Sequence, residues 1–315
     1  MKKYKICKIL LVILAIFLCV AFYELLGICV AYKKQPEVSN TTKKETKNGS
    51  WNECSENTER AVIIEKNPEA LLQRVRLIKN AKKEIILSTF AFQSDESGKL
   101  ILGALHDAAD RGVHIRLLVD GMESWIDMEG NPYFYGLSSH ENVEIKLYNK
   151  ANPLKPWKMM GRMHDKYLIA DGKRYILGGR NTYNYFLGDF PGHKNYDRDV
   201  LVVCDEPEKE NSVNQLLEYF ETIWEQEDSG YFHDNKKLAN RKSVKNAVLE
   251  LQNGYQKYFE ENKERICDTD YTDETFETEK IALVSNPIHT GSKEPVVWYQ
   301  LGELMKNAKN RVKIH

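Results

Sequence analysis

The residues best suited to chemistry lie between positions 163 and 181, in the stretch M-H-D-K-Y-L-I-A-D-G-K-R-Y-I-L-G-G-R-N. Two short runs of β-forming residues flank Asp171-Gly172, a dipeptide typical of tight hairpin turns because both central residues of a type I′ turn need positive φ. The stretch therefore predicts a β-hairpin. Since side chains alternate between the two faces of a strand, His164 and Lys166 are expected on one face.

A two-residue loop would place Gly179 and Asn181 on that same face. In one of the two possible registers, Asn181 lies opposite His164 and Gly179 lies opposite Lys166, with opposed Cβ atoms roughly 5 Å apart. An imidazole, an ammonium group and a carboxamide would then surround a spot that the glycine leaves open. A three-residue loop would reverse this parity.

Such a trio suits a phosphate ester. An imidazole can attack phosphorus or transfer protons near neutral pH. Lysine and amide N–H groups can stabilise the charge that grows on phosphoryl oxygens. Each residue also has a structural alternative: a single strand histidine usually serves packing, the turn itself explains Asp171, and Gly178-Gly179 could form a bulge. No His or Cys cluster of metal-ligand spacing accompanies the trio, so we expect no metal and no other cofactor.

The complete pattern is more specific than any of its residues. His164-x-Lys166, then Asp171, then the segment 178–181 (G-G-R-N) resemble the HKD signature of the phospholipase D superfamily, at fixed spacing over 18 residues. The resemblance implies an α/β fold, a phospholipase D-like half-domain with a mixed β-sheet flanked by helices. It also implies a two-step phosphodiester exchange.

The resemblance assigns a role to each matched position. His164 matches the histidine that either forms a phosphohistidine or protonates the leaving group. Lys166 and Asn181 match the positions that contact phosphate, with Gly179 beside them. Asp171 matches the motif aspartate, which is counted among the catalytic residues although its role is more structural.

Two further carboxylates follow the motif at Asp197 and Asp199. Spaced by two, they would share a strand face, where a carboxylate beside the imidazole fixes its tautomer and supports its charged form. The position of this Asp-x-Asp-Val run after the Gly-Gly-x-Asn resembles bacterial cardiolipin synthases within the superfamily. The alternative is a pair of edge carboxylates with salt-bridge partners.

The N-terminus predicts a membrane anchor, residues 1–32. Four lysines among the first eight residues precede an apolar run, 9–32, that is interrupted only by Glu24 and is long enough to cross a bilayer. A cleaved signal peptide is the alternative, but the run continues past Glu24. We therefore expect a single-pass protein of the cell membrane. Lysines flank both ends of the run, so the side that holds the catalytic domain is open.

The rest of the chain divides by composition. We expect a flexible polar linker at 33–60, the phospholipase D-like domain at 61–228 and a charged helical connector at 229–279. Within the domain, the pattern at 84–120 predicts a parallel strand–helix–strand unit, and 121–142 an irregular wall of the substrate cleft. The segment 153–163 combines Trp and Met with Lys and Arg, and could either touch lipid or pack on the core.

The end of the chain, 280–315, repeats its beginning. The pattern Gln-x3-Leu-x-Lys-Asn-Ala-Lys at Gln300 repeats that at Gln73, at an offset of 227 residues, and a strand at 312–315 should follow. This second copy has no HKD motif. Transfer through a phosphoenzyme needs a nucleophile and a separate general acid, and the resemblance implies two motifs at one site. We expect the second half to come from a missing C-terminal region, or alternatively from another chain.

The leading hypothesis is a membrane-anchored phosphodiesterase or phosphatidyltransferase of cardiolipin synthase type, acting on membrane phospholipid. The net charge is −1, from 45 basic and 46 acidic residues, so nucleic acid is not an expected partner. The alternatives are an HKD-family nuclease and a catalytically incomplete membrane interaction module.

Overall fold

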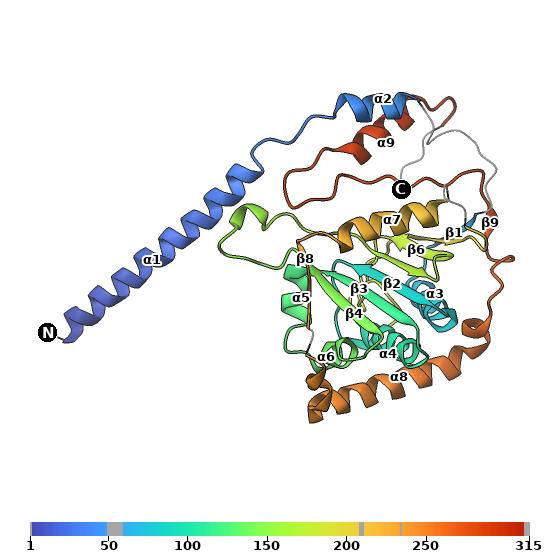
Figure 1. The fold of residues 1–315 in the computed structure, drawn as a ribbon, viewed down its shortest axis with the longest axis horizontal. Helices are drawn as coiled ribbons and strands as arrows, with labels where there is room; N and C mark the ends of the chain where they lie inside the picture. Colours follow the sequence, from blue (N-terminus) through green and yellow to red (C-terminus); the bar gives the residue numbers. More distant parts are fainter. Residues whose placement is uncertain (1, 49–58, 208–210, 234, 312–315) are drawn as a thin grey trace. The chain divides into compact units, whose positions relative to one another are not determined.

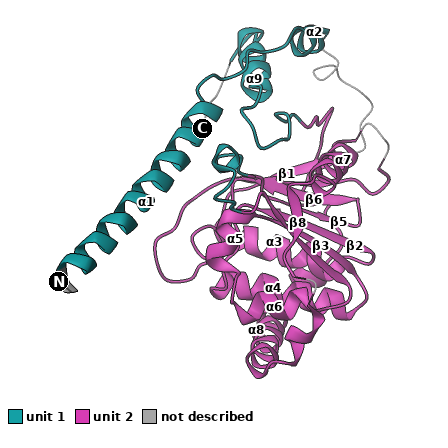
Figure 2. Cartoon of the chain, turned by 60° about the vertical axis from the view of Figure 1, so that its left-hand side comes forward, with its two compact units in different colours: residues 1–50, 151–162, 284–315 teal, residues 51–150, 163–283 magenta. Residues whose placement is uncertain are grey.

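The computed structural model describes residues 2–48, 59–207, 211–233 and 235–311. The chain forms two compact units, shown in different colours in Figure 2. The first contains residues 1–50, 151–162 and 284–315, and the second contains residues 51–150 and 163–283. The strand expected at 312–315 lies outside the described residues.

Helices dominate the first unit: α1 (Lys2–Ala31), α2 (Asn40–Asn48), the short 3₁₀ helix η2 (Pro156–Lys158) and α9 (Val296–Lys306). The segment Tyr4–Ala31 of α1 is long and apolar enough to cross a membrane, by length and composition. The linker expected to be flexible contains α2, because the Ser39 hydroxyl accepts the Thr42 backbone N–H and buries that threonine at the helix start. Residues 49–58 of that linker lie outside the described residues.

The second unit is built on a nine-stranded mixed sheet with the order β8-β4-β3-β2-β5-β6-β7-β1-β9. Its strands are β1 (Arg60–Ile64), β2 (Glu84–Thr89), β3 (His114–Asp120), β4 (Val143–Tyr148), β5 (Tyr167–Ala170), β6 (Arg174–Gly178), β7 (Asp199–Val203), β8 (Ser229–Tyr231) and β9 (Phe276–Glu277). Its helices are α3 (Asn67–Asn80), α4 (Glu96–Asp110), α5 (Gly121–Asp127), α6 (Pro132–Ser138), α7 (Ser212–Trp224), α8 (Lys242–Cys267) and the 3₁₀ helix η3 (Lys236–Asn240). Figure 1 shows α7 on one face of the sheet and α4, α6 and α8 on the other.

The parallel strand–helix–strand unit predicted at 84–120 is confirmed as β2–α4–β3. The carboxylate of Asp95 caps α4 by accepting the Gly98 N–H. The prediction of an irregular segment at 121–142 is wrong. Asp120 and Asn131 accept backbone N–H groups at the starts of α5 and α6, so each cap begins a short helix there.

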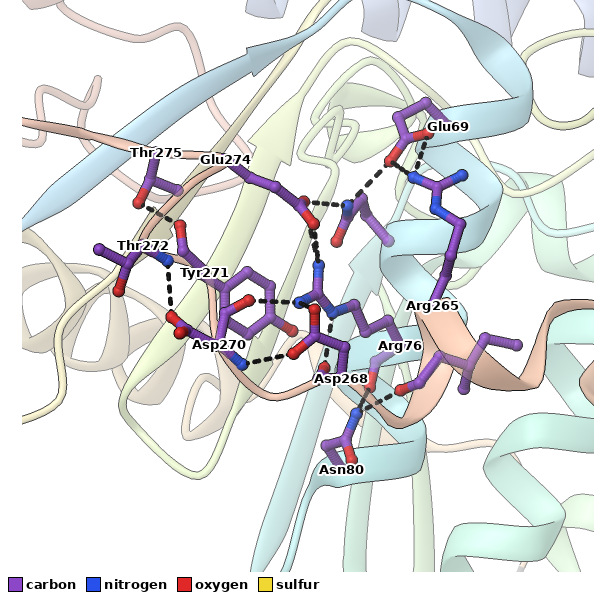
Figure 3. A network of polar contacts seen from close by, with 12 residues as sticks. Glu69, Arg76, Asn80, Arg265, Asp268, Asp270, Tyr271, Thr272, Glu274 and Thr275 are labelled. Atoms are coloured by element: carbon purple, nitrogen blue, oxygen red, sulfur yellow. Dashed lines mark hydrogen bonds and ion pairs between the residues drawn. The ribbon is translucent and has the colours of Figure 1, made fainter.

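The acidic segment after α8 is held by one buried arginine (Figure 3). The guanidinium of Arg76, on α3, donates to the carbonyls of Asp268 and Asp270 at 2.8 and 2.7 Å and to the carboxylate of Glu274 at 2.9 Å. It also lies 3.9 Å from the centroid of the Tyr271 ring. These contacts fix the path of the chain from α8 to β9, which pairs with β1 at the sheet edge.

Replacing Arg76 with alanine should lower the free energy of unfolding by roughly 2–4 kcal/mol, because a buried side chain and its charge-assisted hydrogen bonds to the following segment are lost. Chemical denaturation monitored by circular dichroism measures the change. Arg265→Ala is the matched control: this arginine is half exposed and pairs with Glu69, so its loss should cost at most about 1 kcal/mol. Equal destabilisation by the two variants would contradict a central role for Arg76.

Candidate active site

The predicted hairpin is present as β5 and β6, but its loop has three residues. Ala170 pairs with Arg174, and the Lys173 N–H donates to the Ala170 carbonyl at 3.0 Å. Asp171 and Gly172 have φ values of 55° and 63°, the left-handed conformation that their types predict.

The additional loop residue shifts every expected pairing by one position. The Gly178 N–H donates to the Lys166 carbonyl at 3.1 Å, so Gly178 lies across from Lys166. The expectation that Gly179 opposes Lys166 and that Asn181 opposes His164 is therefore wrong. Since side chains alternate along a strand, a shift of one residue moves them to the other face.

Asp171 holds the hairpin to its neighbouring strand. Its carboxylate accepts the backbone N–H groups of Lys82, Lys83 and Glu84 at 2.8, 2.7 and 3.0 Å. Its own N–H donates to the Glu84 carbonyl. Asp171 lies at the end of β5 away from His164, so its contribution to the site is to position β5 against β2.

His164 and Lys166 lie next to each other, where β5 begins and β2 ends. The Lys166 Nζ is 3.0 Å from His164 Nδ1 and 2.6 Å from the His164 carbonyl oxygen. The imidazole is exposed and meets the ring of Phe90 edge-on, with 4.6 Å between centroids. Lys166 thus contacts both the ring and the backbone of His164.

Lys166 is buried, with 6% of the residue exposed. Burial lowers its pKa to about 8, against the opposing effect of the carboxylates of Asp165 and Asp197. The Tyr219 hydroxyl, from α7, donates to Asp165 at 2.7 Å. Two negative charges therefore help a desolvated lysine to remain charged near neutral pH.

Gly179 provides the space that Asp197 occupies. A Cβ atom at Gly179 would collide with the Asp197 carboxylate, which also accepts the Arg198 N–H at 2.7 Å. Gly179 thus contributes through its missing side chain, by letting a carboxylate approach the backbone close to Lys166.

Asn181 reaches the same end of the sheet by a different route. After β6, the chain runs parallel to the segment that follows β2, with a bridge between Phe92 and Thr182. The Asn181 side-chain oxygen accepts the Ala91 N–H at 3.2 Å, and its amide hydrogen-bonds to Tyr183. His164 contacts Phe90, and Asn181 contacts Ala91. The imidazole and the carboxamide therefore lie beside two consecutive residues of the segment that follows β2.

Asp199 does not accompany the imidazole, contrary to expectation. It is buried, and it forms ion pairs with Arg74 at 2.9 Å and Arg180 at 3.2 Å. Arg180 also donates to the carbonyls of Ile64 and Glu65. The salt-bridge alternative thus describes Asp199, as a core residue rather than an edge residue.

Four further residues that position this site were not predicted from the sequence: Phe90, Arg74, Arg180 and Tyr219. Arg180 could have been suspected from its place between Gly179 and Asn181. Arg74 and Tyr219 gave no signal, since their partners Asp199 and Asp165 lie 125 and 54 residues away in the chain. Among the described residues, no group of three His, Cys, Asp or Glu side chains could hold a metal ion.

Part of the chain is similar to known proteins. Residues 74–224 match the family model described as "Cardiolipin synthase, PLD-like domain". An uncharacterized protein of Helicobacter pylori strain J99 is 30% identical over 212 residues, which cover 62% of this chain and 39% of that protein. Cardiolipin synthase C of Escherichia coli K12 is 29% identical over 171 residues, 50% of this chain and 34% of that protein.

Among solved structures, the phospholipase D family member Nuc from Salmonella typhimurium has 20% sequence identity and a TM-score of 0.40, covering 56% of this chain and 99% of its own. Because residues 74–224 match the PLD-like domain model, the chain belongs to the phospholipase D superfamily. Its matched region spans little more than a third of the length of the two curated relatives, at 39% and 34%.

Lys166 should give anion binding at this site a characteristic pH dependence. Tungstate, a phosphate analogue with constant charge over this range, should bind best below pH 8 and more weakly as pH rises through about 8, because the amine then loses its proton. Asp197→Asn removes a carboxylate that raises the Lys166 pKa, so the midpoint should move to lower pH. Calorimetric titration from about pH 6 to 10 measures both curves.

Asp205→Asn is the control, because this carboxylate is exposed and pairs with Arg174. An unchanged midpoint in Asp197→Asn would contradict the assigned effect of Asp197 on the pKa of Lys166.

Lys166 also makes the stability of the fold depend on pH, in the direction opposite to anion binding. Its pKa is depressed from 10.5 to about 8 in the folded protein, so its contribution to stability should increase as pH rises across that interval.

Proposed function

We propose that the chain forms the catalytic half of a membrane-anchored phosphatidyltransferase of cardiolipin synthase type, which acts through a phosphohistidine intermediate. The single observation that carries this proposal is the exposed imidazole of His164 beside the buried ammonium of Lys166. The imidazole is accessible to a phosphorus atom, while the lysine is desolvated, so its charge acts strongly on a phosphoryl group.

The reaction consists of two displacements at phosphorus. In the first, a histidine nitrogen forms a bond to phosphorus as the bond to the leaving alcohol oxygen breaks, and a general acid protonates that oxygen. In the second, the acceptor alcohol loses its proton to the same group and attacks, and the phosphorus–nitrogen bond breaks. His164 supplies either the nucleophile or the acid, and a second HKD motif supplies the other.

The remaining residues support these steps. Lys166 neutralises charge on the phosphoryl oxygens, and Asp165 and Asp197 maintain its protonation. Asn181, held by Ala91 and Tyr183, presents its carboxamide at the same end of the sheet. Asp171 sets the register that brings these groups together.

A membrane phospholipid is the substrate that the rest of the chain favours. The apolar helix α1 is long enough to hold the protein in a bilayer. The net charge of −1 provides no general attraction for nucleic acid. The Escherichia coli relative is a cardiolipin synthase, cardiolipin synthase C, which supports the same substrate class.

The source of the second motif is suggested by α9, which repeats α3. Leu71 and Leu77 of α3 are both 1% exposed under the sheet, whereas the corresponding Trp298 and Leu304 of α9 are 73% and 42% exposed. Among the described residues, α9 has the same sequence pattern as α3 but leaves its apolar side exposed. We propose that a second phospholipase D-like half covers it, from a longer form of this chain or from another chain.

His164→Ala should lower transfer of labelled phosphatidylglycerol by at least roughly a thousand-fold in the active assembly, because neither displacement proceeds without its imidazole. His193→Ala is the control, since that exposed histidine lies next to Gly192 outside the site. A parallel assay with DNA separates the nuclease alternative. Turnover that survives His164→Ala would make His164 a structural residue and refute the proposed chemistry.

The 315-residue chain alone should have little or no phosphodiesterase activity as a monomer, because one motif supplies only one of the two groups that the exchange needs. Product formation measured across a range of protein concentrations tests this directly. Activity that rises with the square of concentration would indicate pairing of two chains. Full activity in a verified monomer would contradict the need for a second motif.

A further inference from the structure

The loop of residues 151–162, which leads directly into the motif, is apolar and cationic on its exposed side. Leu154, Trp157 and Met160 are 77%, 45% and 58% exposed. Lys155, Lys158 and Arg162 lie between and after them, and no acidic residue occurs in the loop. Packing on a protein core would bury the three large apolar side chains, so the structure does not support that alternative.

The same loop packs on the apolar helix α1, within the first unit. The Tyr23 hydroxyl donates to the Leu154 carbonyl at 3.0 Å. A Cβ atom at Gly27 would lie 2.5 Å from Cγ of Pro156, so only glycine allows η2 to approach α1 this closely. The loop is therefore attached near one end of the helix that could cross a membrane.

The place of attachment along α1 sets the depth of the loop. The apolar run begins at Ile9, directly after Lys8, and roughly 20 helical residues cross the hydrocarbon core of a bilayer. Counting from Ile9, the far boundary falls near Ile28, directly after Gly27, against which Pro156 of the loop packs. Tyr23, whose hydroxyl binds the loop, lies less than two helical turns before this boundary, near the interfacial layer in which tyrosine is enriched.

We propose that loop 151–162 lies in the headgroup layer of a bilayer that contains anionic phospholipid. Leu154, Trp157 and Met160 enter the apolar boundary, and Lys155 and Lys158 bind lipid phosphates. Met163 and His164 follow the loop directly in the chain, so the chain path itself ties the motif to a segment at the lipid surface. This inference deepens the proposed function and rests on its membrane substrate.

Fluorescence of the intact chain in nanodiscs tests the location of Trp157. Lipids brominated on their acyl chains quench tryptophan that reaches the apolar boundary, whereas iodide quenches tryptophan in water. Trp157→Phe should remove a substantial part of the bromolipid quenching. Trp224→Phe is the matched control, because Trp224, the last residue of α7, is 5% exposed and should contribute no lipid quenching.

The proposal is overturned if Trp157→Phe leaves bromolipid quenching unchanged, or if it removes iodide quenching instead. The assay reports position and not turnover. Lipid quenching of Trp157 in a protein without transferase activity would therefore uphold this location while refuting the proposed reaction.

The charge of the loop predicts a preference among lipids. Quenching of Trp157 fluorescence by brominated lipid should be stronger with phosphatidylglycerol than with phosphatidylcholine. The difference should vanish near 1 M salt, where the screening length is about 3 Å. Lys155→Gln/Lys158→Gln should abolish the preference. Lys257→Gln/Lys263→Gln, which removes two exposed charges from α8, should retain it. Equal quenching in both lipids would refute the anionic partner.

Discussion

The site depends on the carboxylate of Asp171, which binds three successive backbone N–H groups at the start of β2. The turn needs two residues in the left-handed conformation, and Asp and Gly are among the few types that adopt it at low cost. The bonds to Lys82, Lys83 and Glu84 then fix the position of β5 along β2. Because strands are stiff, an anchor at one end of β5 determines where His164 and Lys166 lie at the other.

At that other end, the protein keeps a lysine charged although it is removed from water. Desolvation alone disfavours the ammonium, and the neighbouring carboxylates of Asp165 and Asp197 partly offset that cost. Asp197 reaches its place because Gly179 has no side chain, and Asp165 is fixed by Tyr219. Under the proposed function, a phosphoryl group would be a third anion beside this lysine and would raise the pKa of its amine.

The sequence predicted what local rules determine, including the hairpin and the β2–α4–β3 unit. It failed where one residue changes the outcome. The third loop residue, Lys173, reversed the expected pairing of Gly179 and Asn181. The N-cap residues Asp120 and Asn131 each begin a short helix in the segment that was expected to be irregular. The membership in the superfamily followed from the motif, whereas the partners of Asp199 come from distant segments that only tertiary packing brings together.

The ion cluster around Asp199 has an electrostatic consequence for the site. Two buried guanidinium groups, those of Arg74 and Arg180, share one carboxylate, so the cluster carries one net positive charge. Burial lowers the pKa of Arg180 and Asp199 raises it, yet arginine remains charged in proteins. Arg180 directly precedes Asn181, and charges inside a protein are screened far less than those on its surface. The cluster therefore anchors the Gly-Gly-Arg-Asn turn through the carbonyls of β1 and at the same time favours an anion beside Asn181.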